Sequence, residues 1–181
     1  MKVVAISGMS GSGKTSLVNQ LSNSLSCPSI LFDDFVDGQT YPTDMKKWLL
    51  DGANISDIKT PRMDKALLNL VSSSKAEFIF VEEPFGKCRA PISSLVDKVV
   101  LLDMPIDICL SRIISRNIAQ SEEGAFKNIS QYLVKYNEFL RDVYIETNTQ
   151  TRGTSDLIIN KVLSAQTLED TVIQWLRAGA N

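Results

Sequence analysis

A glycine-rich run near the N-terminus, GMSGSGKT at residues 8–15, has the residue types and spacing of a phosphate-binding loop. Its glycines let backbone N–H groups turn inward, where they and the positive end of the following helix hold phosphate oxygens. Lys14 is spaced to reach the β- and γ-phosphates, and the Thr15 hydroxyl is spaced to ligate Mg²⁺. The run therefore predicts a nucleoside triphosphate site. Its expected contacts are Gly8, Ser10, Gly11, Ser12, Gly13, Lys14, Thr15 and Ser16.

Acidic doublets follow two further apolar runs, at Asp33-Asp34 and at Glu82-Glu83. Open α/β sheets bind ligands at the carboxyl ends of their strands, so the first acid of each doublet is expected beside the phosphate loop. Transfer of a phosphoryl group to an alcohol requires a group that accepts the hydroxyl proton, and Asp33 is the predicted base. Glu82 is the predicted carboxylate for Mg²⁺, with Asp33 a further candidate metal contact. Turn capping and a plain acidic strand end are the alternatives.

Two arginines, Arg112 and Arg116, lie four residues apart on one side of a predicted helix. Arginines near a triphosphate neutralise the charge that develops during phosphoryl transfer. Both are therefore predicted to act in catalysis with Lys14, from a lid region at residues 111–125. A solvated helix face is the alternative.

The segment at residues 36–60 is polar and weakly patterned, which predicts a mobile insertion on the substrate side. Asp44 and Trp48 in this segment, together with Asp34 and Glu83, are the candidate contacts for an acceptor molecule. Carboxylates hydrogen-bond to sugar hydroxyls, and an indole stacks on rings. For Trp48, a role as a core anchor is an equal alternative.

Composition indicates an ordinary globular chain: of the 181 residues, 44% are apolar and 22% are charged, with a net charge of −2. The sequence encodes no clustered basic surface of the kind that binds nucleic acid. Because there is no histidine, Ser-His-Asp and Cys-His catalysis are excluded, and carboxylates or hydroxyls must supply any acid or base. Dispersed cysteines and the lack of a long apolar run favour a cytoplasmic protein without a disulfide framework or a membrane partner.

Five short apolar runs alternate with stretches of helical spacing, at residues 3–6, 29–32, 78–81, 99–102 and 157–159. This alternation predicts a parallel sheet with helices on both faces, because right-handed crossovers place each helix against the sheet. Helical spacing also continues across residues 126–144. No repeat or compositional break marks a second domain, so residues 1–181 are predicted to form one domain.

The ordered set of motifs resembles the uridine kinase-like P-loop kinases, a family that includes nicotinamide riboside kinase. The similarity runs almost end to end, from the phosphate loop through Asp33-Asp34-Phe35, Phe80-Val81-Glu82 and Pro84-Phe85-Gly86 to the apolar run that ends at Ile159. The resemblance implies a three-layer α/β P-loop NTPase fold with a five-stranded parallel sheet in the order 2-3-1-4-5. It also implies ATP and Mg²⁺ as cofactors, and Arg152 in a loop that lies against the adenine.

The predicted function is ATP-dependent transfer of the γ-phosphoryl group to a hydroxyl of a nucleoside-like small molecule. One departure concerns the acceptor: residues 117–120 are NIAQ, where uridine kinases carry an Arg-Gly-Arg element, so uridine itself is not predicted. The sequence leaves open whether the protein is a monomer or a homodimer.

Two other classes of P-loop protein compete with the kinase interpretation. A P-loop ATPase or a nucleotide-binding regulator would use hydrolysis rather than phosphoryl transfer, and the Glu82-Glu83 doublet permits this. A guanine-nucleotide switch is disfavoured, because position 163 is leucine where the guanine-reading NKxD motif requires aspartate.

Overall fold

The computed structural model describes residues 1–120 and 124–178, which contain one five-stranded parallel sheet. Its strands are β1 (Lys2–Ser7), β2 (Ser29–Ile30), β3 (Phe78–Glu82), β4 (Lys98–Leu102) and β5 (Leu157–Ile159). Their spatial order is β2-β3-β1-β4-β5, and all neighbouring pairs are parallel. The predicted fold class and strand order are confirmed.

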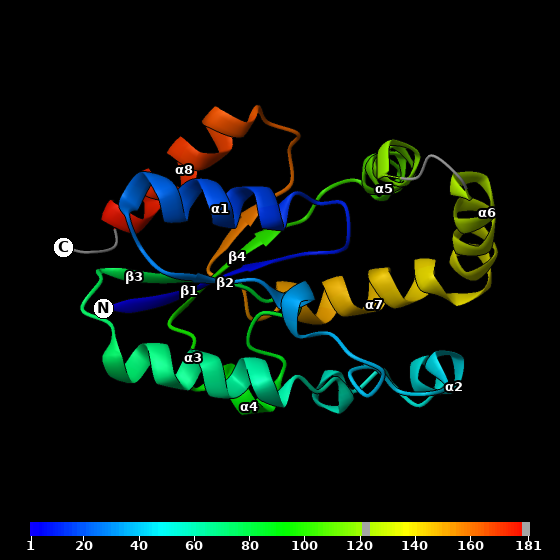
Figure 1. Ribbon diagram of the computed structural model, residues 1–181, viewed down its shortest axis with the longest axis horizontal. Coiled ribbons are helices and arrows are strands. Elements are labelled where there is room, and N and C mark those ends of the chain that lie inside the picture. The colour runs from blue at the N-terminus through cyan, green and yellow to red at the C-terminus, as the bar shows by residue number, and fades with distance from the viewer. Residues whose placement is uncertain (121–123, 179–181) are drawn as a thin grey trace.

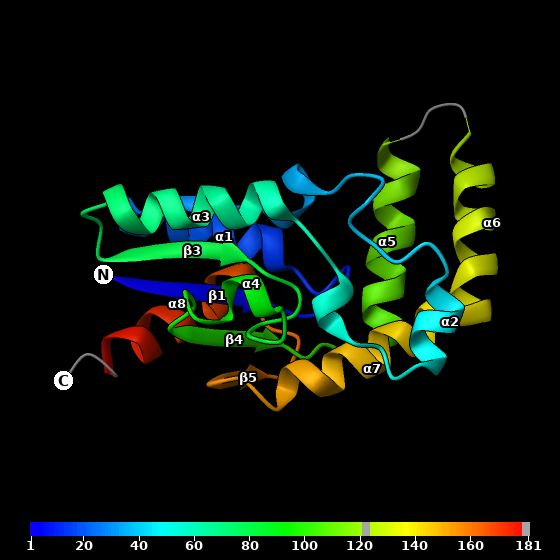
Figure 2. The same ribbon diagram turned by 90° about the horizontal axis from the view of Figure 1, so that it is seen from below.

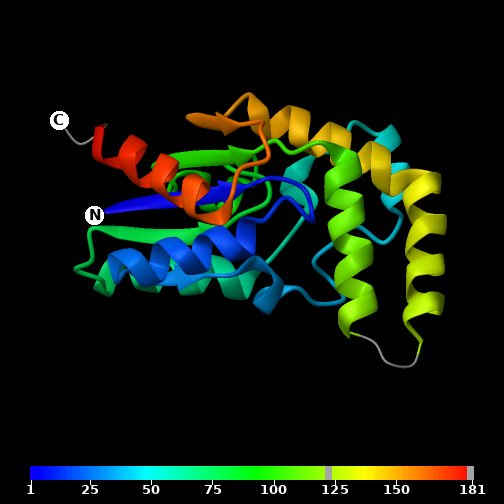
Figure 3. The same cartoon turned by 90° about the horizontal axis from the view of Figure 1, so that it is seen from above.

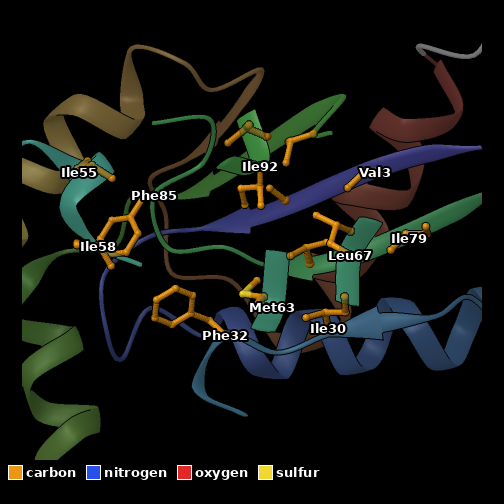
Figure 4. Close-up of a cluster of buried hydrophobic side chains, with 14 of the residues drawn as sticks. Val3, Ile30, Phe32, Ile55, Ile58, Met63, Leu67, Ile79, Phe85 and Ile92 are labelled. Carbon is orange, nitrogen blue, oxygen red and sulfur yellow. The ribbon is translucent and has the colours of Figure 1, made fainter. Parts of the chain in front are cut away.

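The sheet forms the middle of three layers (Figure 1). Helices α1 (Lys14–Leu25) and α8 (Ala165–Ala178) cover one face, and α3 (Pro61–Ser73) and the short α4 (Ala90–Ser93) cover the other. On the α3 side, Val3 and Ile79 of the sheet share a buried cluster with Leu67 and Ile92 (Figure 4). Removal of this apolar surface from water is the main force that holds the layers together.

The strands are apolar along most of their length because both faces of the sheet are covered. β3 reads FIFVE and is buried throughout, and β1 and β4 are buried after their first residue. Polar side chains therefore concentrate at the strand ends. Glu82, the last residue of β3, lies at the carboxyl edge of the sheet, as the sequence predicts.

A helical arm extends beyond the carboxyl edge of the sheet (Figures 2 and 3). It consists of α5 (Ile106–Gln120), α6 (Ala125–Lys135), the π-helical turn η3 (Tyr136–Leu140) and α7 (Arg141–Arg152). Residues 126–144 are helical as predicted, but η3 interrupts the run, and α7 points in a different direction from α6. A π-turn disrupts the regular hydrogen-bond ladder and allows such a bend. Residues 121–123 of the predicted lid region lie outside the described residues.

The segment 36–60, predicted to be a mobile insertion on the substrate side, packs several side chains into the core. It contains α2 (Met45–Leu50) and the 3-10 turn η2 (Ile55–Asp57). Trp48, Ile55 and Ile58 are buried in the cluster shared with α3 (Figure 4 shows the two isoleucines). Sequence periodicity does not reveal this because the buried residues are spaced irregularly across short elements and turns.

Candidate active site

The phosphate loop joins β1 to α1 and depends on glycines with positive φ. Gly8, Gly11 and Gly13 have φ angles of 131°, 81° and 103°, in the region that side chains rarely adopt. A Cβ atom added at Gly11 would lie 2.4 Å from the carbonyl oxygen of Cys109 on α5. The loop therefore has its shape because glycine is present at these positions.

Two side chains from the start of α1 meet Glu82 at the edge of the sheet. Lys14 Nζ donates to the Met9 carbonyl at 3.1 Å and lies 3.7 Å from Glu82 Oε1. Thr15 Oγ1 donates to Glu82 Oε2 at 2.9 Å. The three predicted phosphate and metal contacts are thus brought together.

Burial dominates the electrostatics of this cluster. Burial lowers the pKa of Lys14, although the nearby Glu82 and Asp33 carboxylates act in the opposite direction. Burial likewise raises the pKa of Glu82, against the effects of Lys14 and the Thr15 hydroxyl. Neither charge is fully compensated by the other, as is common where a ligand supplies the missing charge.

Ser12 gives an independent indication that the loop is shaped for an anion. Its hydroxyl oxygen is buried and has no hydrogen-bond partner among the described residues. Buried polar groups are normally paired, so this hydroxyl has an unused hydrogen bond to give to a phosphate oxygen. The loop residues therefore fit a nucleoside triphosphate.

Asp33 reaches the site from a short turn rather than from a strand. β2 ends at Ile30, and the 3-10 turn η1 (Phe32–Phe35) follows. Phe32 is buried and contacts Phe85 edge to face, with ring centroids 5.9 Å apart. This anchor holds the turn, and the exposed Asp33 lines the same cavity as the phosphate loop.

That cavity has a volume of about 650 Å³ and extends from the phosphate loop to the helical arm. Both predicted lid arginines line it, together with Asp33 and Glu82. Arg112 Nη1 donates to the carbonyls of Gly11 and Ser12 at 3.2 and 3.3 Å. The arginine-bearing helix α5 is thus in contact with the loop.

Aromatic side chains that sequence reasoning missed form the far wall of the cavity. Tyr132 of α6 and Tyr144 of α7 line it with their hydroxyl oxygens 3.2 Å apart. Tyr41 also lines it; burial, with a smaller effect from the Asp33 charge, raises the pKa of Tyr41 to about 12. Burial also raises the pKa of Tyr132 and that of Tyr144, so all three phenols stay protonated at neutral pH. Tyr132 and Tyr144 have the helical spacing of packing residues, and Tyr41 stands alone, so the sequence does not distinguish them as cavity residues.

Four predicted acceptor contacts lie away from this cavity. Asp44 caps α2 by accepting from the Lys47 N–H at 2.9 Å, and Trp48 is a buried anchor that donates to the Asn54 carbonyl at 3.0 Å. Asp34 is exposed and is not one of the described residues that line the cavity. Asp44 and Trp48 have local roles in capping and core packing and lie outside the described lining of this cavity, so their contact with an acceptor stays a prediction.

Glu83 is the fourth of these residues and is completely buried. Its carboxylate is paired with the guanidinium of Arg89, 3.0 Å away. Glu83 directly follows β3 and is not among the described residues that line the cavity, whereas Glu82 is. The predicted contact between Glu83 and an acceptor is therefore not supported by its position.

Arg152 lies at the end of α7 and forms an ion pair with Asp103. Asn148, one turn earlier, also donates to Asp103 and lines the cavity. Arg152 is outside the cavity lining as described, so its predicted place beside the adenine stays a prediction.

Mg²⁺ fits the oxygen ligands present. No cluster of three or more histidine, cysteine or acidic residues that could hold a metal occurs in the described ranges. Mg²⁺ in nucleotide sites is held by one or two carboxylates together with phosphates and water, so a full protein cage is not needed. Thr15 and Glu82 would supply the protein oxygens.

Among the helices described, none is long and apolar enough to cross a membrane.

Comparison with known proteins finds one curated relative at the level of sequence. The chain is 26% identical to a protein named uridine kinase from Schizosaccharomyces pombe, in an alignment that is 204 positions long and covers 98% of this chain. The predicted resemblance is confirmed. The chain spans 44% of that relative's length. No family model matches the sequence.

Solved structures share the fold. Shikimate kinase from Acinetobacter baumannii, in complex with shikimate, has a TM-score of 0.58 at 19% identity and covers 99% of this chain and 95% of its own. Shikimate kinase from Aquifex aeolicus has a TM-score of 0.55 at 14% identity and covers 98% of both chains. These neighbours have the same fold despite low sequence identity.

We expect Gly11→Ala to abolish nucleotide binding, because the added methyl group would collide with the Cys109 carbonyl and deform the loop. The measurement is the rise in melting temperature on addition of Mg·ATP, which should vanish in this variant. Gly38→Ala is the matched control, since a Cβ there meets no atom within 4 Å. A normal Mg·ATP shift in Gly11→Ala would contradict the assigned loop geometry.

The affinity for Mg·ATP should weaken at both ends of the pH range. As pH falls through the raised pKa of Glu82, its carboxylate becomes neutral and loses its attraction for a cation. As pH rises through the lowered pKa of Lys14, its ammonium loses the charge that attracts phosphate. Titration calorimetry across pH should show that the loss of Mg·ATP affinity at low pH is smaller in Glu82→Gln than in the wild type. The loss that remains in the variant is the part due to ATP itself. An equal loss of affinity at low pH in both proteins would contradict a contact between Glu82 and the metal.

Proposed function

We propose that the protein transfers the γ-phosphoryl group of ATP to a hydroxyl of a small, nucleoside-like acceptor. The observation that carries the proposal is that Asp33, Lys14 and Glu82 line one cavity with the phosphate loop. A carboxylate able to take a proton thus faces the same space as the groups suited to hold a triphosphate. The relative named uridine kinase supports the same class of reaction.

In the proposed reaction, the acceptor's hydroxyl oxygen forms a bond to the γ-phosphorus, while the bond to the β,γ-bridging oxygen breaks and ADP leaves. Asp33 accepts the proton of the attacking hydroxyl. Lys14 neutralises the β- and γ-oxygens, and Arg112 and Arg116 stabilise the charge on the phosphoryl group in flight. Bound Mg²⁺ would supply further neutralisation of the phosphate charge.

The composition of the cavity wall favours an organic acceptor over water. Phe32, Phe85 and three tyrosines line the same cavity as the phosphate loop. Water needs only a small polar site, whereas a wall of aromatic rings with phenol hydroxyls suits a molecule with both a ring and hydroxyl groups. This wall supports phosphoryl transfer over simple hydrolysis.

The direct test is ADP formation with Mg·ATP across uridine and other nucleosides, nicotinamide riboside, pantothenate, simple sugars and shikimate. We expect at least one acceptor to raise ADP formation about tenfold or more above the rate with water alone. Equal rates with and without every acceptor would favour the ATPase or regulator alternative.

With the best acceptor in hand, Asp33→Asn should lower kcat by about 10²–10⁴-fold, because the amide cannot accept the hydroxyl proton. The Mg·ATP-induced rise in melting temperature should persist. Asp34→Asn is the matched variant, since Asp34 is adjacent in sequence but outside the cavity lining as described. The reverse result, with Asp34→Asn inactive and Asp33→Asn active, would assign the base to Asp34.

A further inference from the structure

Arg89 is a buried cation that the proposed reaction does not use. It caps the start of α4, and its side chain is 0% exposed. Arginine is almost never fully buried unless it is paired. Burial of its charge costs on the order of several kcal/mol before the attraction of any partner is counted. What Arg89 contacts therefore matters.

The guanidinium of Arg89 joins three separate elements. Its Nε and Nη2 donate to the carboxylate of Glu83, the residue directly after β3, at 3.0 to 3.3 Å. Nη2 also donates to Asp64 of α3 at 2.9 Å. Its Cζ lies 6.0 Å from the centre of the Phe32 ring in η1, within the range of a cation–π contact.

Two of these partners adjoin the candidate active site. Phe32 directly precedes Asp33, the proposed base. The backbone of Glu83 is joined to the start of the phosphate loop: its carbonyl accepts from Ser7 Oγ at 2.7 Å, and the Pro84 carbonyl accepts from the Gly8 N–H at 3.2 Å. Arg89 thus links the turn that carries the base to the strand end that supports the loop.

Stability alone is a weak explanation for this arrangement. Buried ion pairs can often be replaced by apolar residues without loss of stability. In addition, Arg89 Nη1 is buried with no hydrogen-bond partner among the described residues, which is a further unfavourable term. What the guanidinium does supply is a rigid, planar group that fixes the directions of several partners at once.

We propose that Arg89 is a positioning residue, which holds the Phe32–Asp33 turn at a fixed distance from the phosphate loop through Glu83, Asp64 and the Phe32 ring. The inference rests on the proposed function of Asp33. It assigns Arg89 an effect on the rate of phosphoryl transfer and none on nucleotide binding. It also predicts that η1 loses order when Arg89 is removed.

The test separates position from charge with two variants. In Arg89→Met/Glu83→Gln both fully buried charges are removed, and only the partly exposed Asp64 carboxylate loses its partner. In Arg89→Lys a cation remains for Glu83, but the planar fork is lost.

We expect both variants to keep the Mg·ATP-induced rise in melting temperature and the KM for ATP. Their kcat should fall about 10²-fold, which is the effect of a small misplacement of a catalytic group. Lys98→Met, at the opposite edge of the sheet, is the control and should retain wild-type kcat.

Amide hydrogen exchange of residues 32–35 provides a readout that does not depend on activity. Exchange there should be about tenfold faster or more in both variants than in the wild type, with exchange in β4 unchanged. Wild-type kcat or wild-type exchange in the double variant would overturn the proposal and leave Arg89 as a neutraliser of Glu83. If the wild type transfers phosphate to no acceptor, the proposed function fails, and the exchange of residues 32–35 still decides the role of Arg89.

Discussion

The contacts of Glu82 with Lys14 and Thr15 tie the sheet to the phosphate loop, and the remaining groups of the candidate site are arranged around them. Parallel pairing of β1 with β3 places Ile6 opposite Glu82 at the carboxyl edge. The loop leaves β1 just beyond this point, and α1 brings Lys14 and Thr15 back to the same carboxylate. A register shift of one residue would turn Glu82 to the other face of the sheet, so strand pairing itself fixes the geometry of the phosphate and metal contacts.

This cluster is unfavourable for the chain alone and suited to a ligand. Burial lowers the pKa of Lys14 and raises the pKa of Glu82, even though the opposite charges of these two side chains attract each other. A triphosphate would compensate the ammonium, and a divalent cation would compensate the carboxylate. The buried Ser12 hydroxyl, which has no partner among the described residues, belongs to the same pattern. Ligand binding would thus offset a cost that folding leaves in place.

The parts of the site that could be predicted from sequence are those set by local chemistry. Eight consecutive residues contain the phosphate loop, and Asp33 and Glu82 could be placed because strands of a parallel sheet end at a common edge. The rest depends on long-range packing. Trp48 reads equally well as a stacking platform or a core anchor until its burial is known. The directions of α6 and α7, which bring the tyrosines to the cavity, follow from a π-turn that no sequence pattern marks.

The two halves of the cavity come from different parts of the fold. The half at the phosphate loop is built on the edge of the sheet, and shikimate kinases at 14% to 19% identity share the fold. The other half is built mainly from segment 36–60 and the helical arm, where Met45 and Phe139 both line the cavity and pack on the same core cluster. The exposed ion pair between Lys46 and Glu138 adds only about 0–1 kcal/mol to this junction. Apolar packing therefore joins the two segments, while α5 of the arm also contacts the phosphate loop through Arg112.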